Sequence, residues 1–304
     1  MWLSPMISEG MIYVKGLGAY SGAMVYALYP SRSMLEGLQN LGWRYWLEGL
    51  ARWFVKAIRS SSFLYKIATS SMPFPLPRIK FGEEGRKGIL SLWARTLDDL
   101  VICKARAYYN IRERVEGIFR GAPHIRIRTS DESLNIEKSS LIDLLRRELT
   151  DIAILSKVEP ILETRVGSVI LRGRPDLYLM ANIGKVIRGL IIELHETDFN
   201  AIKKTWHVLP RLYVYALASY MRYGITPISF SIPLSIGEKL AVLCLANTTG
   251  KLANQVKEIR IGLPHISTLL SELSYISTLD RPPRPYSKSK IFCKECRYRT
   301  ICEF

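Results

Sequence analysis

The sequence predicts an α/β protein in which a central mixed sheet is flanked by helices. Apolar strand runs over 158–198 and 228–245 predict the sheet, and helical periodicity over 86–150 and 200–223 predicts the helices. The 304 residues are 48% hydrophobic and 10% aromatic, which is enough apolar material for a sizeable core. We expect an N-terminal, mainly helical accessory region over 1–80, a core over 81–280 and a C-terminal tail over 281–304.

Aromatic side chains alternate with arginines in the accessory region. Helical periodicity runs from Met34 to Ile58, and the proline-rich segment Pro73-Phe74-Pro75-Leu76-Pro77 marks a boundary. Aromatics beside arginines can stack on single-stranded bases, although such stripes more often form ordinary core.

The core follows with helices and then strands. The clearest helices are Leu90 to Arg114 and Ser140 to Leu149. The strand runs are Val166 to Leu171, Leu177 to Met180 and Val186 to His195, with a turn at Asn182-Ile183-Gly184. A helix over 200–223 and two strands around Pro233 complete it.

The charge of the chain indicates a polyanionic partner. Its 43 Lys and Arg against 27 Asp and Glu give a net charge of +16, and each phosphate that a cation neutralises releases counterions. Nucleic acid is the preferred interpretation, with a membrane surface as its competitor.

No apolar run reaches the length of a membrane span, and Met1-Trp2-Leu3-Ser4-Pro5 does not resemble a secretory signal. We therefore expect a cytoplasmic protein with no membrane association. Glutamine occurs only at Gln39 and Gln255, which is typical of thermophiles.

Three cysteines are grouped in the tail, which reads Cys293-Lys-Glu-Cys296-Arg-Tyr-Arg-Thr-Ile-Cys302. Three thiolates are one short of the usual four for zinc or an iron–sulfur cluster. Cys244 lies in an apolar strand pattern and is expected to be a small core residue. Cys103, with basic and aromatic neighbours, is the better fourth ligand.

Acidic residues next to apolar strands mark a second candidate site. Asp176 follows Leu171-Arg-Gly173-Arg-Pro, and Glu193 and His195 end the run Val186 to His195. In a strand Glu193 and His195 project to one face, and an unpaired buried charge is costly, so these carboxylates are expected to have a role. His195 can act as a base near neutral pH; the alternative is a strand-end histidine that faces solvent.

Together these motifs resemble the CRISPR-associated iron–sulfur exonucleases of spacer acquisition, in particular their type I-A-like branch. That family has one cysteine in an early helix and a Cys-x2-Cys-x5-Cys tail around a RecB/PD-(D/E)xK-type nuclease core, an arrangement shared by the bacterial AddB nuclease subunit. Its Cys-x-x-Arg-x-x-Tyr pattern matches Cys103, Arg106 and Tyr109, and the resemblance covers about residues 95–304. It implies a 4Fe–4S cluster bound by four cysteines, with zinc as the alternative: Cys103, Cys293, Cys296 and Cys302.

The resemblance also implies a nuclease site. Gly173 and Asp176 match the family's Gly-x-x-Asp, Glu193 matches Glu-x-Lys, and Tyr215 matches Gln-x-x-x-Tyr. Asp176 and Glu193 would then hold Mg²⁺ or Mn²⁺, and the implied catalytic residues are Asp176, Glu193, His195 and Tyr215.

The chain departs from the family at several positions. His195 stands where the family has lysine, and Arg211 where it has glutamine. The helix from Ser140 lacks the family's metal-binding histidine, and His124 is the only histidine nearby. Lys203 or Lys204 could supply the missing cation.

The implied function is a metal-dependent DNA exonuclease or endonuclease that trims DNA ends during CRISPR spacer acquisition. The implied partners are single-stranded or overhanging DNA, CRISPR integrase subunits and a sister nuclease. Two alternatives stay open: a catalytically weakened iron–sulfur, DNA-binding scaffold subunit of the adaptation complex, and a zinc-ribbon nucleic-acid-binding protein.

Overall fold

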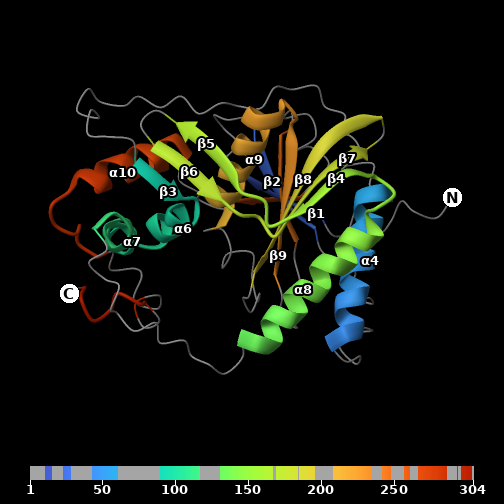
Figure 1. Ribbon diagram of the computed structural model, residues 1–304, viewed down its shortest axis with the longest axis horizontal. Helices are drawn as coiled ribbons and strands as arrows, with labels where there is room; N and C mark the ends of the chain where they lie inside the picture. The colour runs from blue at the N-terminus through green and yellow to red at the C-terminus, as the bar shows by residue number, and fades with distance from the viewer. Residues whose placement is uncertain are drawn as a thin grey trace.

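The structure is a computed structural model that describes the following parts of the chain: 11–15, 23–28, 43–60, 90–116, 131–166, 169–183, 185–195, 208–233, 242–247, 257–260, 266–285, 293 and 296–302. These parts form two mixed sheets with helices around them (Figure 1). The strands are β1 (Met11–Lys15), β2 (Ala23–Leu28), β3 (Leu90–Trp93), β4 (Ala153–Val158), β5 (Leu162–Val166), β6 (Val169–Gly173), β7 (Leu177–Ile183), β8 (Val186–His195), β9 (Pro227–Pro233), β10 (Val242–Asn247) and β11 (Lys257–Arg260). The helices are α4 (Trp43–Ser60), α6 (Arg95–Ile102), α7 (Lys104–Glu116), α8 (Asp131–Glu148), α9 (Leu209–Tyr223) and α10 (Ile266–Thr278).

The main sheet has the strand order β11-β1-β2-β10-β9-β8-β7-β4. β7 and β8 form an antiparallel pair in which Leu177 lies opposite Ile192, and β8 runs parallel to β9. Lys185, at the turn between β7 and β8, has a φ of 71°, a left-handed conformation that is typical of tight turns. A smaller sheet has the order β3-β6-β5. The predicted mixed α/β fold with flanking helices is confirmed.

Helices cover both faces of the main sheet, so each central strand is apolar on both sides. α4 and α8 lie side by side on one face, where Phe54 and Leu145 pack against Leu179 and Ile192 (Figure 1). The opposite face, which includes Tyr178 and Ile191, is covered by α9, and the smaller sheet and α6 pack on α9 in turn. Because residues alternate along β8, Glu193 and His195 project toward the same side as Ile191.

The structure corrects the expected separation of residues 1–80 from the core. β2 pairs with β10 over Ala23 to Leu28, so strands from the N-terminal region extend the main sheet. The predicted helix from Met34 to Ile58 coincides in part with α4, whose Trp46, Leu50 and Phe54 are buried. The proposed boundary at 73–77 lies outside the described residues.

A second correction concerns the expected single helix from Leu90 to Arg114. Its first residues form β3, which pairs with β6, and the rest divides into α6 and α7. The break is at Cys103, whose φ of −162° and ψ of 125° are extended rather than helical. Helical periodicity continues across the break, so the sequence pattern alone does not show it.

The expected single strand from Val166 to Leu171 instead comprises the last residue of β5 and the first part of β6, which pair antiparallel. The other predicted elements agree with the structure where it describes them. β8 has the predicted bounds, and β7 and β9–β10 occupy the predicted strand regions. α9 covers 209–223 of the predicted helix over 200–223, and α8 covers 140–148 of the predicted helix from Ser140 to Leu149. None of the helices that the structure describes has the length and apolar character to cross a membrane.

Candidate functional site

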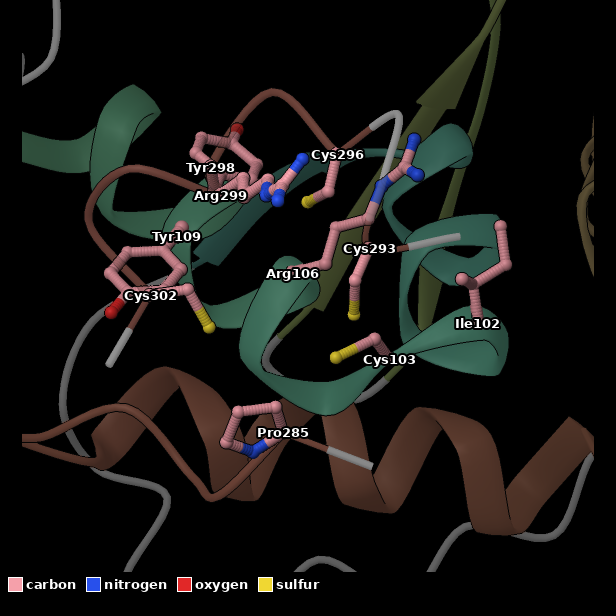
Figure 2. Close-up of a pocket in the computed structure, with 10 residues that line it drawn as sticks. All are labelled: Ile102, Cys103, Arg106, Tyr109, Pro285, Cys293, Cys296, Tyr298, Arg299 and Cys302. Atoms are coloured by element: carbon pink, nitrogen blue, oxygen red, sulfur yellow. The ribbon is translucent and has the colours of Figure 1, made fainter. Parts of the chain in front are cut away.

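The four predicted cluster cysteines line one small pocket. Cys103 sits at the break between α6 and α7, and Cys293, Cys296 and Cys302 come from the tail. Figure 2 shows their side chains directed into the space between them, with Arg106 and Tyr109 beside them. The structure therefore brings together residues up to 199 positions apart in sequence, counted as 302 minus 103.

The tail is held against α7 by contacts that involve no cysteine. The rings of Tyr109 and Tyr298 stack with centroids 5.5 Å apart, and the Tyr109 hydroxyl donates to the carbonyl of Ile301 at 3.0 Å. The Tyr298 hydroxyl donates to Glu113 Oε2 at 2.6 Å, and Arg297 pairs with the same carboxylate at 3.1 Å. Tyr109 thus fixes the tail from the helix that follows Cys103.

Backbone turns in the tail bring its three cysteines to the side that lines the pocket. The Cys296 amide donates to the Cys293 carbonyl at 3.3 Å, and the Cys302 amide donates to the Tyr298 carbonyl at 3.0 Å. Burial and then the neighbouring thiols of Cys103, Cys296 and Cys293 raise the pKa of Cys302. When such neighbouring thiols lose their protons, the thiolates repel one another, and a cationic centre between them relieves this repulsion. The four cysteines are therefore a suitable donor set for such a centre.

This donor set fits an iron–sulfur cluster. Four cysteine thiolates are the ligands of a 4Fe–4S cluster, and each binds a different iron. Within the described residues, no three His, Cys, Asp or Glu side chains are arranged to hold a single metal ion. Cys244 is a fully buried core residue of β10, as predicted, and burial raises its pKa.

The predicted carboxylates are neighbours at the end of the β7–β8 pair. Asp176 immediately precedes β7, and Glu193 follows Ile192, the partner of Leu177. The amide of Leu194 donates to Asp176 Oδ2 at 2.6 Å, which fixes the Asp176 carboxylate against β8. Asp176, Glu193 and His195 are all buried, so the alternative of a solvent-facing His195 is wrong.

Arg211 connects the carboxylate site to α6. Its guanidinium lies 3.1 Å from Glu193 Oε1 and 3.2 Å from Asp98 Oδ2, and 3.4 Å from His195 Nδ1. Burial raises the pKa of Glu193 to about 7 and that of Asp98 to about 7, while Arg211 opposes both shifts. Glu193 Oε2 and Asp98 Oδ1 accept no hydrogen bond from the part of the chain that the structure describes.

Lys138 of α8 reaches the same site from the other side of the sheet. Its Nζ lies 2.6 Å from Asp176 Oδ1. Burial raises the pKa of Asp176, and the Lys138 ammonium opposes that shift. Sequence reasoning missed Lys138, and the lysines that it suggested, Lys203 and Lys204, lie outside the described residues, as does His124.

Lys138, Glu193 and Arg211 line a cavity of about 330 Å³ that is rich in charge, and Asp176 is not among its lining residues. Its lining includes four cations, three acids and one histidine: Arg95, Arg106, Lys138, Arg211, Asp98, Asp99, Glu193 and His195. Ile102 and Arg106 line both this cavity and the cysteine pocket, so the two sites share a wall. Arg106 also pairs with Asp99 at 2.6 Å.

Tyr215 lies near the carboxylate site: burial raises its pKa, and the charge of Glu193 adds to that shift. It is buried in the core of α9 and is not among the residues that line the cavity. Its ring packs instead against Gly173 at the end of β6. Tyr215 thus packs against Gly173 and interacts electrostatically with Glu193 and Arg211, and its part in catalysis stays a prediction.

The pair Asp176 and Glu193 suits Mg²⁺ or Mn²⁺. Mg²⁺ is commonly held by one or two carboxylates together with waters and substrate phosphates. Glu193 Oε2 has a free acceptor position among the described residues, and Asp176 lies beside it on the neighbouring strand. The residues present thus fit the implied ion, with Lys138 and Arg211 as competing cations.

Comparison with known proteins gives little. No family model matches the chain, and no curated protein matches it. A solved structure titled "Crystal structure of SSO0001" aligns with a TM-score of 0.39 and 15% sequence identity, over 73% of this chain and 88% of that chain. A likeness at that level carries no argument about function.

Proposed function

We propose that this chain is a metal-dependent deoxyribonuclease with a RecB-type core and a 4Fe–4S cluster, which trims single-stranded or overhanging DNA ends during CRISPR spacer acquisition. One observation carries the proposal. Asp176, Glu193 and His195 lie together at the ends of two adjacent strands. The cavity beside them shares a wall, at the break between α6 and α7, with the pocket that four cysteines line. The resemblance of the motifs to that family supplies the pathway and the partners, the integrase subunits and a sister nuclease.

The charge around the cavity suits a phosphodiester substrate. Arg95 is exposed beside Asp98, and Arg106 and Lys138 are partly exposed in the cavity wall. Cations at such positions bind phosphate oxygens and hold the strand in register without reading its sequence. The net charge of +16 means that the molecule as a whole also attracts the negatively charged DNA.

Hydrolysis forms one P–O bond from water and breaks the P–O bond to the leaving nucleotide. The water loses a proton, and the leaving oxygen gains one. A bound Mg²⁺ or Mn²⁺ would polarise the phosphate and its water. Asp176 and Glu193 would hold that ion, and His195 lies on the same strand face as Glu193, where it can take up a proton.

The decisive experiment is a nuclease assay with Mn²⁺ on single-stranded and overhanging DNA, with Asp176→Asn and Glu193→Gln alongside the wild type. Each variant should lose cleavage while its affinity for DNA stays within about threefold of the wild type, because the ligands of the ion are not the phosphate-binding cations. Asp143→Asn, on an exposed position of α8, is the matched control and should cleave normally. Equal background cleavage in all four proteins would contradict the proposal.

A second candidate is favoured by the ion pairs at the site. Asp176 forms an ion pair with the ammonium of Lys138, and Glu193 forms one with the guanidinium of Arg211. A site neutralised by its own chain can bind DNA without an ion, as a scaffold subunit of the adaptation complex would. In that case the wild type binds DNA and supports spacer integration by its partners, yet shows no cleavage with Mg²⁺ or Mn²⁺.

A further inference from the structure

We propose that Lys138 is a catalytic residue of this site: its ammonium supplies, from α8, the positive charge that His195 does not supply from β8. The inference rests on the proposed nuclease function and deepens it. The ligand class is the phosphate group at the bond to be cleaved. The inference starts from the contact of 2.6 Å between Lys138 Nζ and Asp176 Oδ1.

The position of Lys138 on its helix places it toward the sheet. Leu141 and Leu145, three and seven residues later, are fully buried against the main sheet, and residues at this spacing share one helix face. Lys138 therefore continues the apolar stripe of α8 with a charged residue. A lysine on such a stripe needs an acidic partner, because burying an unpaired charge is costly. Asp176 is that partner.

Lys138 differs from the other cations that line the cavity. Arg211 is held between two carboxylates with its side chain 11% exposed, and Arg106 is paired with Asp99. The side chain of Lys138 is 26% exposed and lines the cavity with Glu193, Leu194 and His195. Lys138 is a lysine, whereas the other cations that line the cavity are arginines. The lysine ammonium is a compact charge with three donors at the end of a flexible side chain. It can turn from Asp176 to a phosphate oxygen.

The chemical role follows from where charge develops. As water attacks the phosphorus, negative charge grows on the phosphate oxygens and on the leaving oxygen. An ammonium next to the carboxylate that would hold the ion stabilises this charge more in the transition state than in the bound substrate. Lys138 would act on the rate of cleavage more than on the affinity for DNA.

The test compares Lys138→Met, Lys138→Arg and the wild type in single-turnover cleavage with Mn²⁺, with DNA affinity and Mn²⁺ affinity measured in parallel. Lys138→Met should slow cleavage by about 100-fold, the effect of losing one stabilising group, while DNA affinity changes by less than about threefold. Its Mn²⁺ affinity should equal or exceed that of the wild type, because the ammonium no longer competes for Asp176. Lys138→Arg should regain at least about a tenth of the wild-type rate. Lys157→Met, at an exposed position of β4, is the matched control.

The outcomes separate this inference from the proposed function. If the wild type cleaves and Lys138→Met cleaves equally well, Lys138 is not catalytic and the nuclease assignment stands. If Lys138→Met loses cleavage and Mn²⁺ binding together, or Lys138→Arg regains nothing, Lys138 only holds Asp176 in place and the inference is wrong. An inert wild type overturns the proposed function and this inference with it.

Discussion

The ring of Tyr215 lies so close to Gly173 that a Cβ atom at position 173 would come within 1.9 Å of Tyr215 Cε1. Gly173 ends β6 in the smaller sheet, and Tyr215 lies in α9, which packs on that sheet. Tyr215 is 3% exposed and belongs to the core. The contact makes glycine necessary at 173 for steric reasons alone.

Gly173→Ala should therefore destabilise the protein. Overpacking in a well-packed core costs about 1–3 kcal/mol of the free energy of unfolding, measured by urea or thermal denaturation. Tyr215→Leu in the same chain should recover part of the loss, so the two substitutions should be non-additive. An alanine variant as stable as the wild type would show that α9 can move away from β6.

The strands of the site could be predicted from sequence because their signals are local. The apolar run of β8 and the spacing from Asp176 to Glu193 already imply neighbouring strands, and the structure places these carboxylates side by side. That the four cysteines lie together was predictable for a related reason, since the tail spacing groups three of them and the context of Cys103 indicated it as their partner; the structure places all four around one pocket.

Lys138 and Arg211 could not be predicted in this way because their partners are distant in sequence. Lys138 lies 38 residues before Asp176, and Asp98 lies 113 residues before Arg211, by subtraction of their numbers. Charged residues within helices normally face solvent, so only the three-dimensional arrangement shows that these two are directed inward. The strands of residues 1–80 were missed for a similar reason, because β2 finds its partner in β10.

The cysteine pocket predicts a coloured protein with a defined ligand set. Cys296→Ala should abolish the visible absorbance and iron content and lower the midpoint of thermal unfolding, since the ligand joins the tail to α7. Cys244→Ala, a core position outside the pocket, is the matched control and should keep its iron. Full iron content in Cys103→Ala would show that the fourth ligand is another residue. Zinc instead of iron by elemental analysis would favour the zinc alternative.

DNA binding should weaken steeply with salt. A net charge of +16 predicts several phosphate contacts, so affinity should fall by at least about 100-fold between about 50 and 200 mM salt. Arg281 and Arg284 are exposed near the cysteine pocket, and replacing both by Gln should lower the slope of log affinity against log salt by about 2. Arg44→Gln, exposed on α4, should leave that slope unchanged. Salt-independent binding would contradict a phosphate-dominated interface.

Arg211 should be a main stabilising residue of the fold around the site. Replacing it with Gln, the residue that the related motif carries, removes the guanidinium that lies between Asp98 and Glu193. Two buried carboxylates then lose their ion-pair partner, and breaking a buried ion pair costs about 3 kcal/mol or more of the free energy of unfolding. Arg222→Gln, an exposed arginine on the same helix, should stay within about 0.5 kcal/mol of the wild type. Adding Asp98→Asn to Arg211→Gln should restore part of the loss, because an amide is cheaper to bury than an unpaired carboxylate. Equal stability of Arg211→Gln and Arg222→Gln in urea denaturation would mean that α6 and β8 are held together by their apolar contacts, with no contribution from this ion pair.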